Sequence, residues 1–138
     1  MARVIPQFDP RLIGVWSNGR LYAARAATDV RILFKPDFTG RYETWHDAKL
    51  NEVITFRWSP PEADRVTLAG IDYLFRENDQ VRREPCDWHF EAVAYSIAAE
   101  RVPAGEGLPV LRLKFAPTRV DRYGLLTTDF KGFEEPSF

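Results

Sequence analysis

Apolar and polar side chains alternate from residue 30 to residue 58, which is the pattern of β-strands that bury one face. Two turns interrupt the alternation, one at residues 36–40 and one within residues 47–53. The stretch therefore predicts three consecutive antiparallel strands. Alternate positions of the first two strands form the predicted inward face, which comprises Val30, Ile32, Phe34, Tyr42, Thr44 and His46.

The turn at residues 36–40, whose last residue is a glycine suited to a left-handed backbone, sets the register of the first hairpin. It places Phe34 opposite Tyr42. In the second hairpin only one phase keeps all the apolar residues inward, and it places His46 opposite Ile54. The other phase would bury an arginine. His46 is thus predicted to lie among inward-facing aromatic side chains.

The rest of the chain carries further strand patterns and little helix. A short helix is predicted at residues 21–27, after the first strand. The alternation changes phase at Ala69-Gly70, which indicates a β-bulge. The additional strand segments are 12–17, 64–75, 88–101, 110–115 and 121–130.

These elements predict an all-β fold of a single domain covering residues 1–138. About eight antiparallel strands with one short helix are typical of an up-and-down β-barrel or a β-sandwich. A barrel of this size has an interior that side chains fill or that holds one small ligand.

Two motifs resemble the calycin superfamily, which contains the lipocalins and the fatty-acid-binding proteins. Gly14-Val15-Trp16 on the first strand is similar to the G-x-W motif of that group, and residues 34–42 resemble the hairpin that follows it. The resemblance covers about the first 60 residues and implies a lipocalin-like barrel in which Trp16 plugs one end. The Thr128-Asp129-Phe130 segment lies too near the C-terminus to match the second lipocalin motif.

Composition limits the cellular setting and the partners. A formal net charge of −1 argues against binding to nucleic acid or to a membrane surface through bulk charge. The single cysteine, Cys86, forms no internal disulfide and suits a reducing cytoplasm. No apolar run is long enough to span a membrane. The spacing of His and Cys residues matches no metal site, and no cofactor is predicted.

The aromatic interior has two interpretations. One is a packed core without a ligand. The other is a small pocket in which a few polar groups orient a hydrophobic or aromatic molecule. The predicted ligand-binding residues are Tyr42, Thr44, His46, Phe56 and Trp58.

Proton-transfer chemistry depends on which face of residues 88–101 points inward. If His89 and Glu91 face inward beside His46, a metal-free acid/base enzyme, such as an isomerase or cyclase, becomes conceivable. If Trp88 and its alternate neighbours face inward, His89 and Glu91 are solvent-exposed. The sequence leaves both alternatives open, and His46 is either a hydrogen-bonded core-edge residue or a ligand contact.

The outward face of the first strands suggests a third function. Leu33 and Trp45, together with Ile13 and Val15, would form an apolar patch on the outer wall. Such a patch suits a homodimer or a non-enzymatic partner complex of the inhibitor or immunity-protein kind. The sequence favours a small-ligand-binding protein first, an interaction module second and an acid/base enzyme third.

Overall fold

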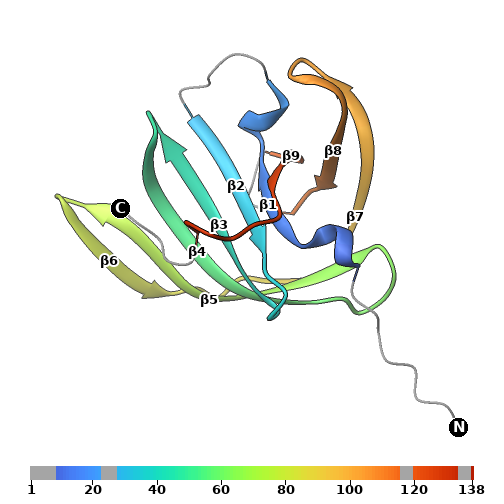
Figure 1. Cartoon of the computed structure of the whole chain (residues 1–138). Coiled ribbons are helices and arrows are strands. Elements are labelled where there is room, and N and C mark those ends of the chain that lie inside the picture. Colours follow the sequence, from blue (N-terminus) through green and yellow to red (C-terminus); the bar gives the residue numbers. More distant parts are fainter. Residues whose placement is uncertain (1–8, 23–27, 116–119, 134–137) are drawn as a thin grey trace, which may run out of the picture.

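The computed structural model describes residues 9–22, 28–115, 120–133 and 138. Within these residues the chain forms nine antiparallel strands and two 3-10 turns, η1 (Pro10–Leu12) and η2 (Gly19–Leu21) (Figure 1). The strands are β1 (Gly14–Ser17), β2 (Thr28–Phe34), β3 (Thr39–His46), β4 (Lys49–Ser59), β5 (Arg65–Glu77), β6 (Gln80–Pro85), β7 (His89–Val102), β8 (Gly105–Leu113) and β9 (Arg122–Thr127). The prediction of an all-β antiparallel fold is confirmed.

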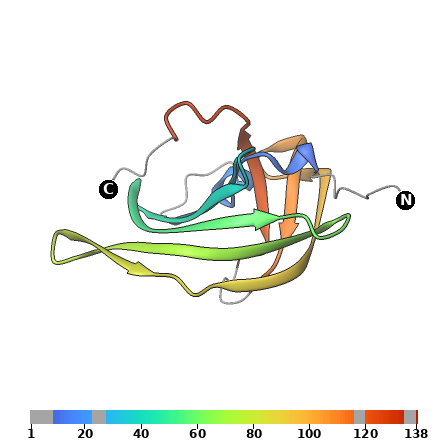
Figure 2. The same ribbon diagram turned by 90° about the horizontal axis from the view of Figure 1, so that it is seen from below.

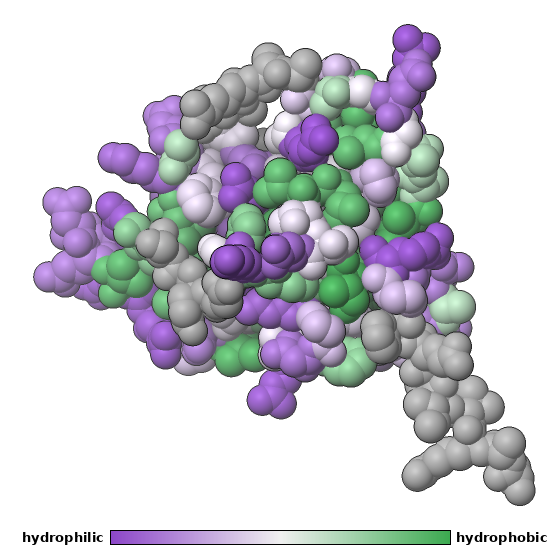
Figure 3. All heavy atoms as spheres, in the orientation of Figure 1, coloured by the Kyte–Doolittle hydropathy of each residue, from purple (hydrophilic) through white to green (hydrophobic). Residues whose placement is uncertain are grey.

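The strands form one sheet in the order β4-β3-β2-β1-β9-β8-β7-β5-β6. Because β4 also pairs with β5, the sheet closes into a ring that contains every strand except β6. The distal half of β5 pairs with β6 instead of β7, so this hairpin projects beyond the ring (Figures 1 and 2). Hydrophilic side chains gather around the projecting tip on the left of Figure 3.

The predicted α-helix after the first strand is not found in the described residues, where η2 alone follows β1. Most of the predicted helix, residues 23–27, lies outside the described part of the chain. Asp29 holds the turn of η2 in place, because its carboxylate accepts hydrogen bonds from the Gly19 N–H and the Ser17 hydroxyl.

The β2–β3 hairpin keeps the predicted faces but shifts its register by two residues. Phe34 lies opposite Gly40, and Tyr42 lies opposite Ile32. The left-handed turn residue is Phe38, at φ 65°, rather than Gly40. Gly40 is needed for space, since a Cβ there would lie 2.3 Å from the Leu33 carbonyl oxygen. A shift of two preserves the alternation of faces.

The β3–β4 hairpin corrects the predicted position of His46. Tyr42 lies opposite Ile54, and an irregularity between Thr44 and Trp45 breaks the ladder. His46 then pairs with Lys49 across a two-residue turn with left-handed backbone angles. His46 is therefore exposed at the hairpin tip, and its predicted inward position is wrong.

The core lies inside the ring and is dominated by aromatic and branched side chains. Trp16 is fully buried there, and its indole N–H donates to the Leu12 carbonyl oxygen at 2.9 Å. Apart from His46 and the partly buried Thr44, the residues predicted to face inward belong to the buried core or pack against it. The buried members of the core are Leu12, Trp16, Ile32, Phe34, Tyr42, Ile54, Phe56, Trp58, Val66, Leu68, Tyr95, Leu111, Leu113, Phe115 and Tyr123.

Two bulges change which residues face the core on β5 and β7. The β4–β5 ladder shifts at Ile71, directly after Gly70, so the bulge predicted at this glycine is confirmed. On β7 the register against β5 also shifts, and Ala92 has a left-handed backbone with φ 48°. Trp88 packs inward before this break and Tyr95 after it, so each of the two alternatives for residues 88–101 holds for half of the strand.

Candidate ligand-binding face

Five neighbouring strands present two rows of cross-strand partners on the inner face of the sheet. Residues opposite one another in a ladder point to the same side, so each row is continuous from β2 to β6. We call these ten residues the inner platform. One row is Val30, Thr44, Glu52, Phe75 and Arg82, and the other is Ile32, Tyr42, Ile54, Tyr73 and Glu84.

In the row of the inner platform that begins at Ile32, burial decreases from β2 to β6. Ile32 and Tyr42 are buried inside the ring, Tyr73 is half-buried, and Glu84 on the projecting hairpin is exposed. The platform therefore begins in the core and ends at the surface. A ligand lying on it would contact apolar groups on one side and reach charged groups on the other.

A carboxylate and a phenol meet in the middle of the platform. The Tyr73 hydroxyl donates to Glu52 Oε2 at 2.6 Å. Burial and this hydrogen bond to the carboxylate raise the pKa of Tyr73 to about 12. The phenol therefore stays protonated at neutral pH and acts as a hydrogen-bond donor.

Glu52 keeps acceptor capacity for a further partner. A carboxylate accepts several hydrogen bonds, and Tyr73 occupies one oxygen. In the described part of the chain no lysine or arginine forms an ion pair with Glu52. Arg82 lies in the same row but pairs with Glu77 instead, with its Nε atom 3.7 Å from Glu77 Oε1.

The Thr44 hydroxyl lies beside this carboxylate without a hydrogen bond. Thr44 is the direct cross-strand neighbour of Glu52, and its Oγ1 atom is buried with no partner among the described residues. Buried hydroxyls normally have a partner, because the lost hydration costs about 1–3 kcal/mol. Because the Thr44 oxygen is closed to solvent, it reaches a ligand only if the side chain turns about its Cα–Cβ bond.

Aromatic rings flank the polar groups. The rings of Tyr73 and Phe75 stack with their centroids 4.8 Å apart. On the core side, the Tyr42 ring meets Trp88 edge-on at 5.4 Å, and Trp88 meets Phe115 at 5.5 Å. The exposed side of such rings suits a flat apolar or cationic group.

The structure divides the predicted ligand-binding residues into three groups. Tyr42 and Thr44 lie on the inner platform. Phe56 and Trp58 are packed in the core, where the Trp58 indole N–H donates to the Lys35 and Thr39 carbonyl oxygens at 3.2 and 3.1 Å. His46 is separate from both, with 64% of its side chain exposed and its Nε2 atom 3.3 Å from Asp47.

The predicted acid/base pair lies outside the ring. His89 Nε2 is 3.1 Å from Glu91 Oε2, but 66% of each side chain is exposed. These residues precede the bulge at Ala92, where the inward positions belong to Trp88 and Phe90. The hypothesis that His89 and Glu91 enter the ring beside His46 is therefore wrong.

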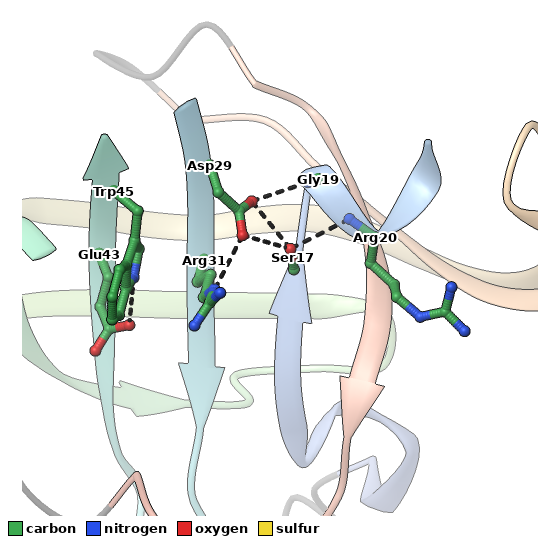
Figure 4. A network of polar contacts seen from close by, with 7 residues as sticks. All are labelled: Ser17, Gly19, Arg20, Asp29, Arg31, Glu43 and Trp45. Atoms are coloured by element: carbon green, nitrogen blue, oxygen red, sulfur yellow. Dashed lines mark hydrogen bonds and ion pairs between the residues drawn. The ribbon is translucent and has the colours of Figure 1, made fainter. Parts of the chain in front are cut away.

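The outer wall is also different from its prediction. Leu33 is fully buried, and Trp45 is half-buried in a polar network (Figure 4). The Trp45 indole N–H donates to Glu43 at 3.0 Å, and the Arg31 guanidinium lies 4.5 Å from the Trp45 ring centroid. The predicted open apolar patch on this wall is thus absent from the described surface.

The sequence analysis missed Glu52, Tyr73 and Phe75 as site residues. Glu52 lies within the segment assigned to a turn, so its membership of β4 and its inward direction were hidden. Tyr73 and Phe75 follow the bulge at Ile71, and this bulge determines the face of the sheet on which their side chains lie. The signal in the sequence that could have identified these two residues was their alternate spacing after Gly70.

Metal ligands and membrane-spanning helices are two further features by which the described residues can be judged. Their His, Cys, Asp and Glu side chains form no group of three or more that is arranged to hold a metal ion. None of the helices in this part of the chain is long and apolar enough to cross a membrane. No family model, curated protein or solved structure matched the chain.

Proposed function

We propose that this protein binds a small aromatic molecule carrying a hydrogen-bond donor, such as an amine, on the inner platform. The observation that carries the proposal is the half-buried Glu52 carboxylate, which accepts a hydrogen bond from the Tyr73 phenol and forms no ion pair with a lysine or arginine of the described residues. Binding sites combine an apolar surface with a few polar groups that fix orientation, and this is the composition of the platform.

Each group has a role in the proposed complex. The ligand's amine donates to the remaining acceptor positions of Glu52. The ligand's ring lies against Tyr73 and Phe75, on the half-buried part of the platform. Tyr42 forms the buried end and limits the ligand's length.

We also propose that the ring is a calycin-like β-barrel. The closure of the sheet through β4 and β5 and the burial of Trp16 support this relationship. A cytoplasmic location belongs to the same proposal and rests on the single cysteine.

Native mass spectrometry of the protein purified from its own cells is the first experiment. A small additional mass that is lost on denaturation supports the proposal and gives the ligand's formula. A direct binding test uses tryptamine, with indole-3-acetate as the matched control that carries a carboxylate in place of the amine. Calorimetry should detect saturable binding of tryptamine and none of indole-3-acetate.

Variants locate the binding. Glu52→Gln should abolish tryptamine binding, because it removes the charge that attracts the amine, while Glu62→Gln on the exposed surface should leave it unchanged. Tyr73→Phe should weaken tryptamine binding. Tyr22→Phe should not, because Tyr22 is a half-exposed residue outside the inner platform. Binding that is equal in Glu52→Gln and the parent protein would contradict the proposed site.

A further inference from the structure

The outer wall carries a hollow of about 310 Å³ beside the turn between β3 and β4. Small-molecule sites in proteins have volumes of about 300–1,000 Å³, so this hollow is large enough for one small ligand. We call it the outer hollow. The described residues that line it are Trp45, Ala48, Lys49, Leu50, Arg76 and Phe138.

An irregularity in the β3–β4 ladder brings the apolar side chains of the outer hollow together. The register shifts between Thr44 and Trp45, so that Trp45 pairs directly with Leu50. Irregularities of this kind re-aim side chains at the edges of sites. Leu50 is 4% exposed, and Trp45 is half-buried beside it. The outer hollow therefore offers an apolar surface made of a ring and a buried aliphatic side chain.

Polar contacts hold the Trp45 ring in one orientation (Figure 4). Its indole N–H donates to Glu43 Oε1 at 3.0 Å, and the Arg31 guanidinium lies 4.5 Å from the ring centroid. Arg31 is itself held by Asp29, whose Oδ2 atom accepts from Arg31 Nε at 2.9 Å. A ring that is fixed before binding loses little conformational entropy when a ligand packs against it.

Two cations line the outer hollow without an acidic partner. Lys49 and Arg76 are exposed, and neither forms an ion pair with an acidic residue in the described part of the chain. Two other arginines of this wall, Arg31 and Arg41, already have carboxylate partners. The described lining contains no carboxylate side chain. The outer hollow is therefore complementary to an anion that carries an apolar group.

A second hollow, of about 330 Å³ on β7 and β8, shows the opposite arrangement. Arg112, Lys114 and Asp121 are among its lining residues, so a carboxylate is already present. Arg112 also donates two hydrogen bonds to Glu100, at 3.0 and 2.8 Å. Charge is thus largely balanced within the chain at this second hollow, whereas the cations of the outer hollow are left for a ligand.

We propose that the outer hollow binds a small phosphate monoester with an aromatic body. The ring packs against Trp45 and Leu50, and the phosphate oxygens accept hydrogen bonds from the Lys49 ammonium and the Arg76 guanidinium. A phosphate monoester carries about −1.5 to −2 charges at neutral pH, which matches two cations, whereas a carboxylate carries one. The site is independent of the inner platform, where the Glu52 carboxylate repels a phosphate.

Isothermal titration calorimetry of the full-length protein with 1-naphthyl phosphate tests the proposal. Saturable binding to one site is expected. The control 1-naphthaleneacetate has the same ring and one negative charge, and it should bind about 10-fold more weakly because one cation stays unneutralised. Inorganic phosphate should also bind more weakly, because it has no ring to bury. Added salt should weaken the binding of the ester, since both cations are exposed.

Variants assign the binding to the outer hollow. Arg76→Gln and Lys49→Gln should each weaken the binding of 1-naphthyl phosphate about 10-fold, because each removes a charge-assisted hydrogen bond. Arg83→Gln is the matched control, because Arg83 is an exposed arginine on the neighbouring strand β6 and is not among the lining residues. It should keep the affinity of the parent protein. Glu52→Gln should also leave the affinity unchanged.

Several results would overturn the proposal. Circular dichroism first checks that each variant is folded. An absence of saturable binding at millimolar concentration would overturn it, as would equal affinities for the ester and for inorganic phosphate or 1-naphthaleneacetate. Equal losses in Arg83→Gln and Arg76→Gln would show that only general charge attracts the ester, and a changed affinity in Glu52→Gln would place the ester on the inner platform. Either result overturns the proposed site, while tryptamine binding tests the inner platform separately.

Discussion

The two faces of β3 contrast most clearly in how their polar groups are connected. On the inner face Thr44 has a buried hydroxyl without a partner. On the outer face Glu43 accepts from Trp45, and nearby Ser17 donates to Asp29 at 2.8 Å (Figure 4). The outer wall thus carries a connected network of polar groups, in which Arg41 still keeps two buried nitrogen atoms without a partner among the described residues, whereas the Thr44 hydroxyl on the inner platform joins no such network.

The faces also contrast in what covers them. The inner face is covered by the opposite side of the ring, and its aromatic residues pack against one another. Residues 128–133, which form no strand, cross the outer face near a buried ion pair between Arg41 and Glu43 (Figure 1). The inner face is thus covered by apolar packing, while the outer face combines fully buried apolar residues, such as Val15 and Leu33, with the buried Arg41–Glu43 ion pair.

The largest expected effect is on the inner side. Trp16→Ala should lower the free energy of unfolding by about 3–5 kcal/mol, because it removes a fully buried ring from the core. Urea unfolding followed by circular dichroism measures the change. The matched change Trp45→Ala, at a half-buried position of the outer wall, should have a clearly smaller effect. Equal losses in the two variants would remove the contrast between the faces.

The next effect concerns the ion pair on the outer wall. Arg41→Leu should cost about 3 kcal/mol of unfolding free energy, because it leaves the Glu43 carboxylate buried without its cation. The double variant Arg41→Leu with Glu43→Leu should recover most of that loss. Urea unfolding of the two single variants and the double variant measures the coupling between Arg41 and Glu43. If the losses of the two single variants simply add up in the double variant, the predicted coupling is contradicted.

A smaller effect compares two hydroxyl groups. Ser17→Ala should cost about 1–3 kcal/mol, because the Ser17 hydroxyl donates to the Asp29 carboxylate. Thr44→Val should be neutral or stabilising by up to about 1 kcal/mol, because the buried Thr44 hydroxyl has no partner to lose. Thermal and urea unfolding should show changes in the free energy of unfolding that differ in sign, or clearly in size, between the two variants. A loss in Thr44→Val as large as that in Ser17→Ala would show that this hydroxyl is satisfied.

The smallest effect is a pH dependence at alkaline pH. The pKa of Tyr73 is raised to about 12, mainly by burial and by Glu52, and that of Tyr95 is raised to about 12 by burial and the nearby Asp9. The unfolded chain releases these protons near pH 10, so the stabilisation is complete below pH 10 and is lost as pH rises towards 12. Ultraviolet titration of tyrosinate should detect late-ionising residues, and Tyr73→Phe should remove one of them.

Sequence alternation was sufficient for the faces of the central strands. Ile32, Tyr42 and Ile54 face inward as predicted, although the register moved, because a shift by an even number of residues leaves every side chain on its face. The prediction failed where the ladder is irregular, at His46 on β3 and between His89 and Tyr95 on β7. An irregularity reverses the alternation, and the residue pattern located the one at Gly70 but not those at Thr44–Trp45 and at Ala92.

The sequence by itself determined the all-β character and the inward aromatic residues of the central strands, since these follow from alternation and hydrophobicity along single strands. The tertiary structure alone decided which residues form the inner platform, because Thr44, Glu52 and Tyr73 meet only through the pairing of three strands. It also decided that the outer wall is covered, because the segment that binds Arg41 is 92 residues away along the chain. Contacts of that range depend on the closure of the ring, which brings distant segments together.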